Sequence, residues 1–138
     1  MKDKTTKMVE LVKTEIDVAV VMERLKSPKN GAIASYFGSV RDTSKGKTVD
    51  RLIYPEEGSF QVLKKMEELR TRALNKFDIR DVVIVQRLGV LKPGDNILFA
   101  GISAAMREPA FDACRYLIDR IKTEVHSGWK KEFYGNEN

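Results

Sequence analysis

Apolar residues recur every three or four positions in two long stretches of the chain, which is the spacing of a helix with one buried face. The first stretch opens at Gly58 and Ser59, and its predicted buried face comprises Phe60, Leu63, Met66, Leu69, Ala73 and Phe77. The second runs from about Glu108 to about Val125, and its predicted buried face comprises Phe111, Cys114, Ile118, Ile121 and Val125. A shorter helix is expected after Asp17, whose side chain can cap it.

Shorter apolar segments bounded by turn residues predict strands between these helices. They cover residues 8–16, 31–40, 51–54, 79–89 and 96–105. The last two flank a turn with Pro93 and Gly94 at its corner, and we expect them to pair as a hairpin. Strand pairs interrupted by helices indicate an α+β domain of two layers, with three helices against a mostly antiparallel sheet. We expect residues 1–7 to be a flexible N-terminus and residues 8–138 to form a single domain.

Composition and charge narrow the class of protein. The chain has 138 residues, of which 42 % are hydrophobic, and this is ordinary for one globular domain. Its formal net charge of +5 suits an anionic partner, which leaves a phosphorylated metabolite, a nucleic acid or an acidic protein open. The single cysteine excludes an internal disulfide. With no apolar leader after Met1 and no long apolar run, a cytoplasmic location is expected.

Three lysines near the C-terminal end are the first candidates for chemistry. Lys122 flanks the apolar stripe of the last helix, and Lys130 and Lys131 follow Trp129 directly. A lysine at the edge of such a stripe often lays its stem on apolar surface and keeps its charge in water. Crowding by other cations lowers the pKa of an amine, which suits it for acid, base or nucleophile chemistry. Both interpretations of Lys122 stay open at this point.

Two arginines at element ends are the next candidates. Arg41 follows a predicted strand end and Arg107 precedes a predicted helix start, where anions bind readily. Arg107 and Lys122 are 15 residues apart on one predicted helix, which at ~1.5 Å per residue is roughly 22 Å. They cannot contact one small ligand within one chain. A site that uses both therefore requires a second copy of the protein.

Other residue types point to no specific chemistry. Cys114 falls on a predicted buried face and is interpreted as a packing residue. His126 is the only histidine, and no second histidine or cysteine stands at a spacing typical of metal ligands. The chain has no glycine-rich phosphate loop of the Walker or dinucleotide type and no motif of a serine hydrolase.

Several segments taken together resemble the MoaE family, the large catalytic subunits of molybdopterin synthase. The resemblance rests on "GAIASYFGSVRD", on "RLGVLKPGD" with the "REPAF" helix start, and on "IKTEVHSGWKKE". It implies the α/β-hammerhead fold and conversion of cyclic pyranopterin monophosphate to molybdopterin. The sulfur would come from a thiocarboxylate on the C-terminal Gly-Gly of a small ubiquitin-like (MoaD-like) subunit. The family's assembly is a homodimer with one small subunit at each end, a heterotetramer, and no cofactor, nucleic acid or membrane is implied.

The resemblance also implies roles for individual residues. Lys122 matches the family's essential lysine, and Lys130 matches the lysine of the WKKE motif, so both are predicted to be catalytic. Substrate binding is predicted for Arg41, Arg107, Lys130 and Lys131, and no metal site is implied.

The chain departs from the family pattern in several places. Met106 stands where the family usually has a histidine, and one extra residue separates Lys122 from Lys130. Two alternatives therefore stay open: a diverged, non-catalytic subunit, and a basic module that binds RNA or another polyanion. Against the module, the strands lack a pair of aromatic residues interleaved with basic ones for base stacking.

Overall fold

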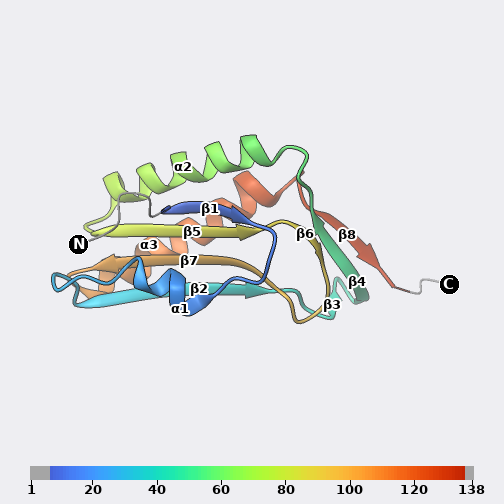
Figure 1. The fold of residues 1–138 in the computed structure, drawn as a ribbon, viewed down its shortest axis with the longest axis horizontal. Coiled ribbons are helices and arrows are strands. Elements are labelled where there is room, and N and C mark those ends of the chain that lie inside the picture. Colours follow the sequence, from blue (N-terminus) through green and yellow to red (C-terminus); the bar gives the residue numbers. More distant parts are fainter. Residues whose placement is uncertain (1–6, 136–138) are drawn as a thin grey trace.

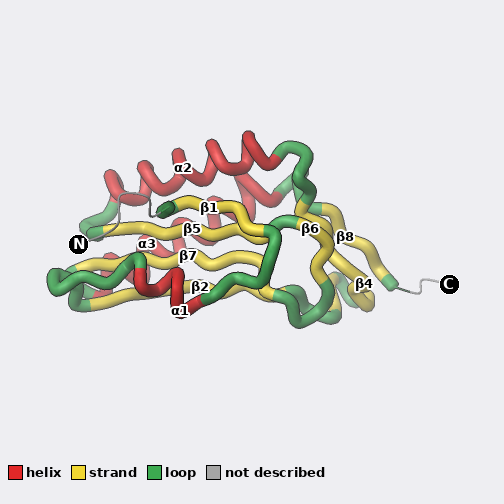
Figure 2. The backbone as a smooth tube through the Cα atoms, viewed as in Figure 1, coloured by secondary structure: helices red, strands yellow, loops and turns green. Residues whose placement is uncertain are grey.

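The described part of the chain is residues 7–135 of a computed structural model, in which the strands form two sheets and the helices pack on the faces of the larger one (Figures 1 and 2). The strands are β1 (Val9–Val12), β2 (Ala32–Ser39), β3 (Thr43–Ser44), β4 (Lys47–Tyr54), β5 (Asp81–Arg87), β6 (Gly89–Leu91), β7 (Asn96–Ala104) and β8 (Lys131–Tyr134). The α-helices are α1 (Val18–Glu23), α2 (Ser59–Lys76) and α3 (Arg107–Arg120), and α3 continues as a π-helix, η1 (Ile121–His126). Residues 1–6 of the expected N-terminal segment lie outside this description.

The main sheet has the strand order β1-β5-β7-β2. β1 pairs with β5 in parallel, while β5–β7 and β7–β2 are antiparallel. Helices α2 and α3 pack on one face, α2 against β1 and β5 and α3 against β7 and β2. The other face carries α1, whose Val21 joins Val83, Val85 and Phe99 in a second small core. The α+β architecture with a mostly antiparallel sheet, predicted from the sequence, is confirmed.

The second sheet lies at one end of the first, where β4 pairs with β3, β6 and β8 (Figure 1). The predicted hairpin of residues 79–89 and 96–105 is confirmed by the pairing of β5 with β7. Its first strand ends earlier than predicted, at Arg87. Gly89 then adopts a φ of 113°, a conformation that glycine accepts without a steric penalty. The chain thereby turns out of the main sheet, and β6 joins the second one.

The predicted buried faces of both long helices are correct only in part. In α2 the buried residues are Val62, Met66, Leu69 and Ala73. Phe60, which was predicted to be buried, is 63 % exposed. Phe60 precedes Met66 by six residues, and at about 100° per residue the two side chains point roughly 120° apart around the helix axis. Val62 precedes Met66 by about one turn and lies on the same face. In α3 Phe111 is 61 % exposed, because Ala110, Ala113, Cys114 and Leu117 form the centre of the buried stripe.

Candidate active site

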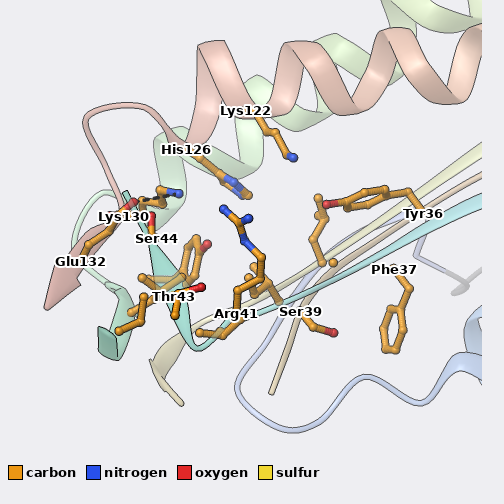
Figure 3. A pocket seen from close by; sticks show the side chains of 17 residues that line it. Tyr36, Phe37, Ser39, Arg41, Thr43, Ser44, Lys122, His126, Lys130 and Glu132 are labelled. Atoms are coloured by element: carbon orange, nitrogen blue, oxygen red, sulfur yellow. Dashed lines mark ion pairs between the residues drawn. The ribbon is translucent and has the colours of Figure 1, made fainter. Parts of the chain in front are cut away.

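A cavity of about 430 Å³ opens where the end of β2 meets β4 and the π-helix. Three cations line it, each from a different segment: Arg41 after β2, Lys122 on η1 and Lys130 before β8 (Figure 3). Three of the residues proposed from the sequence thus share one cavity, although 89 positions separate the first from the last. Glu132 is the only carboxylate among the described residues that line it.

Arg41 is held at the cavity by an irregular strand end. The pairing of β2 with β7 shifts register between Gly38 and Ser39. A side chain at Gly38 would meet the Tyr36 ring at 2.9 Å, so glycine leaves room for this ring on the cavity wall. Val40 exchanges backbone hydrogen bonds of 2.9 Å with Asp95 and Gly94. Arg41 itself is exposed and forms no ion pair within residues 7–135.

Lys122 lies on the wide turn of the π-helix, and its ammonium points into the space above Arg41 and Tyr36 (Figure 3). The Nζ atom is 5.5 Å from the centroid of the Tyr36 ring, within the range of a cation–π contact. A π-helix takes in one extra residue per turn and is often found at functional sites. Lys122 on this turn and Lys130 after it both line the same cavity.

Lys130 is placed by the packing of its neighbour. The indole of Trp129 donates a hydrogen bond to the Glu57 carbonyl oxygen at 3.2 Å. The amides of Trp129 and Lys130 both donate to the His126 carbonyl oxygen, at 3.0 and 3.1 Å. Lys130 Nζ lies 3.3 Å from a carboxylate oxygen of Glu132. The hydroxyl of Tyr134 donates to the same carboxylate, and these contacts hold the pKa of Glu132 below its usual range.

Two further cavity residues, Tyr54 and His126, were not proposed as functional from the sequence. Tyr54 is 1 % exposed, and burial raises the pKa of its hydroxyl well above the usual value, with the Glu132 carboxylate adding to the effect. It is therefore a neutral group at physiological pH. His126 is 6 % exposed, and its Nε2 lies 2.6 Å from Oε1 of Gln86 on β5. Burial, together with the charges of Lys130 and Lys122, lowers the pKa of His126 to about 4.

The neutral His126 makes stability depend on pH. In the unfolded chain the pKa of His126 returns to about 6.5, so on acidification the unfolded state binds a proton before the folded state does. Lowering the pH from 6.5 to about 4 therefore favours unfolding. We expect the free energy of unfolding to fall by about 2 kcal/mol between pH 7 and pH 5. Urea denaturation at the two pH values measures this difference. His126→Gln is the control, because it should remove most of the dependence; an equal dependence in the variant would contradict the assignment.

The remaining two predicted site residues lie elsewhere in the chain. Arg107 lines a separate cavity of about 660 Å³ together with Asp78 and Met106, at the start of α3, whereas Lys122 follows the end of that helix. This agrees with the separation derived from the sequence. Lys131 is exposed on β8, opposite Ile53 of β4, and does not line the cavity of Lys122 and Lys130.

Within residues 7–135 no group of three or more histidine, cysteine, aspartate and glutamate side chains is arranged to hold a metal ion. None of the helices in this part of the chain combines the length and apolar composition needed to cross a membrane.

Comparison with known proteins gives one consistent family. The family model described as "MoaE protein" matches residues 11–124. The molybdopterin synthase catalytic subunit of Pyrococcus abyssi is 36 % identical over 118 residues, which are 86 % of this chain and 78 % of that protein. The protein of the same name from Dictyostelium discoideum is 35 % identical over 94 % of this chain and 84 % of its own length.

Solved structures share the fold. Molybdopterin synthase from Staphylococcus aureus superposes with a TM-score of 0.83 at 27 % identity, covering 95 % of this chain and 94 % of the other. A chain in the complex of subunits 1 and 2 of molybdopterin-converting factor from Helicobacter pylori superposes with a TM-score of 0.70, over 96 % of this chain and 92 % of the other. At 14 % identity this second likeness shows the fold alone.

Proposed function

The chain belongs to the MoaE protein family, and from this premise we propose that it is the catalytic subunit of a molybdopterin synthase. It converts cyclic pyranopterin monophosphate to molybdopterin by inserting two sulfur atoms. Each sulfur is delivered as the thiocarboxylate at the C-terminal Gly-Gly of a small ubiquitin-like subunit. The names of the relatives, which are catalytic subunits of molybdopterin synthase, support an enzyme subunit that works with a partner subunit.

The observation that carries the proposal is the gathering of Arg41, Lys122 and Lys130 around one cavity that has a single lining carboxylate within the described residues. Both proposed ligands, a cyclic phosphate and a thiocarboxylate, are anions. Arginine and lysine bind such groups through short, charge-assisted hydrogen bonds. We assign the phosphate to Arg41 and Lys130, with Arg107 supplied by a second copy of the chain.

Lys122 then acts where the thiocarboxylate meets the substrate. In each transfer the thiocarboxylate sulfur forms a bond to a substrate carbon, and a carbon–oxygen bond at that carbon breaks, so the oxygen leaves as water or stays on the opened phosphate. Water then adds to the acyl carbon and the acyl carbon–sulfur bond breaks, so the tail leaves as a carboxylate. Lys122 serves either as the acid and base for sulfur attack and water loss or as the group that stabilises the tetrahedral oxyanion.

One assay separates this function from its alternatives. The protein is incubated with thiocarboxylated small subunit and cyclic pyranopterin monophosphate, and molybdopterin is measured. Product formation supports the proposal. Binding of the small subunit without product would favour the diverged, non-catalytic subunit, and retention of RNA without product would favour the polyanion-binding module.

Replacing Lys130 is expected to weaken substrate binding. Lys130→Ala removes a charged hydrogen-bond donor, which is worth about 1.5–3 kcal/mol and corresponds to a KM higher by about ten- to a hundredfold. The value of kcat should fall less, because the proposed partner is the phosphate and not the reacting carbon. Steady-state kinetics with varied pyranopterin measure both constants.

Lys29→Ala is the matched control for that variant. It changes the net charge equally at an exposed position outside the cavity, and we expect KM to change by less than about twofold. An equal rise in KM for both variants would mean that the phosphate senses overall charge and that the cavity is not its site.

A further inference from the structure

His126 is a buried titratable group at the proposed active site to which the proposed reaction gives no role. Its ring packs against two aromatic side chains, with centroid distances of 5.2 Å to Tyr54 and 6.2 Å to Trp129. Figure 3 shows it between Lys122 and Lys130 on the cavity wall. A histidine held this firmly beside two lysines needs an explanation beyond filling space.

The π-helix is what turns His126 toward the core. In an α-helix a residue five positions after Ile121 would lie about 140° around the axis from it, on a different face. The wider π-helix forms its hydrogen bonds between residues five positions apart, so such residues lie closer to one face than in an α-helix. Accordingly Ile121, Val125 and His126 are all buried in η1.

Gln86 fixes which ring nitrogen of His126 carries the proton. The amide nitrogen of Gln86 donates to the carbonyl oxygens of Arg87 at 2.7 Å and Ile97 at 3.4 Å. Turning the amide over would set its oxygen against two carbonyl oxygens, so Oε1 must face His126. An oxygen can only accept in the contact of 2.6 Å to Nε2. Nε2 therefore carries hydrogen, and in the neutral ring Nδ1 keeps a lone pair.

Nδ1 is available to a ligand. Within residues 7–135 it forms no hydrogen bond, and it is not among the fully buried polar atoms that lack a partner. The charged side chains that line the same cavity as His126 are mostly cations, namely Lys122, Lys130 and Arg41, while Glu132 is engaged by Lys130 and Tyr134. His126 thus offers a neutral acceptor of fixed direction in a cavity that otherwise attracts anions.

We propose that His126 is a substrate-positioning residue whose Nδ1 accepts a hydrogen bond from a ring N–H of the pterin. The identity of the ligand rests on the proposed function. A reduced pterin carries N–H donors as well as its cyclic phosphate, so the phosphate meets the cations and a ring N–H meets the acceptor that lies among them. The cations select an anionic ligand, and the pair of Gln86 and His126 selects one that also carries a ring donor.

Because the chain has one histidine, labelling histidine with ¹⁵N gives a single pair of ring signals. Without ligand, we expect Nε2 to resonate as the protonated nitrogen and Nδ1 as the unprotonated one, between pH 6 and 8. Adding cyclic pyranopterin monophosphate alone, without the small subunit, should shift Nδ1 in the direction of an accepted hydrogen bond. The opposite tautomer, or a saturated complex with an unchanged Nδ1 signal, would overturn the inference.

A pair of variants tests the same contact by kinetics. The amide of a glutamine reaches the Nε2 position, so His126→Gln can still donate to Gln86 but lacks the Nδ1 acceptor. Its KM for the pyranopterin should rise about three- to tenfold, the effect of one neutral hydrogen bond, with kcat nearly unchanged. The amide of an asparagine reaches the Nδ1 position, so His126→Asn should recover part of the affinity. A purely structural role of His126 does not predict a lower KM for His126→Asn than for His126→Gln, because His126→Asn loses the hydrogen bond to Gln86.

The outcomes separate this inference from the proposed function. If the parent protein neither binds nor converts the pyranopterin, the proposed function fails, and with it the ligand assigned to His126. If the parent forms molybdopterin and His126→Gln shows the parent KM, the inference alone is overturned.

Discussion

Lys122→Arg is expected to abolish molybdopterin formation almost as completely as Lys122→Ala. Arginine keeps the positive charge, but its guanidinium stays protonated at any working pH and cannot exchange a proton with the substrate. Loss of a general acid or base, or of an oxyanion donor, lowers kcat by about 10²–10⁴. The measurement is product formation with saturating thiocarboxylated small subunit and pyranopterin.

The controls for Lys122 separate chemistry from folding. Both variants should stay folded and bind the small subunit, because Lys122 lies at the cavity rim and outside the core. Lys65→Arg is the matched substitution: Lys65 is exposed, its ammonium contacts the Glu124 carbonyl on the same π-helix, and it lies outside the cavity. A folded Lys122→Ala protein that forms product at the parent rate would end the mechanism. Activity of Lys122→Arg well above that of Lys122→Ala would favour oxyanion stabilisation over proton transfer.

Local patterns in the sequence predicted most of the fold. The spacing of apolar residues located both long helices, and the turn at Pro93 and Gly94 located the hairpin, because both signals are contained within one element. The errors in the predicted buried faces arise because these signals are local. Phe60 and Phe111 are large apolar residues near the edge of a helical stripe, and only the packing of the neighbouring sheet decides which edge is covered.

The site was predictable only where its residues stand at element ends. Arg41, Lys122 and Lys130 were proposed from such positions and line one cavity. The pair of His126 and Gln86 was not foreseen, because 40 residues separate the two and Gln86 appears in the sequence as one polar residue within a buried strand. The π-helix that turns His126 inward was equally hidden. The only signal in the sequence was one extra residue before the WKKE motif.

A mixture of two impaired proteins, assayed at a pyranopterin concentration near the parent KM, is expected to regain activity if the site is shared between copies. Lys122→Ala lacks the reacting amine, and Arg107→Ala lacks the arginine that a second copy supplies. In a mixed dimer one site carries both defects and the other carries neither. Random association of equal amounts therefore restores about a quarter of the parent sites. Coexpression or joint refolding, followed by the molybdopterin assay, measures the recovered activity.

A second mixture provides the control, because Arg41 and Lys122 line the same cavity of one chain. Mixing Arg41→Ala with Lys122→Ala leaves one defect in each site of the mixed dimer, so no native site forms and activity should stay at the level of the single variants. If activity recovers in the mixture with Arg107→Ala and not in the mixture with Arg41→Ala, Arg107 acts across the dimer. This is expected because Arg107 lies at the start of α3, roughly 22 Å along the helix from Lys122. Equal activity of the two mixtures, or a monomer by light scattering at micromolar concentration, would contradict the shared site.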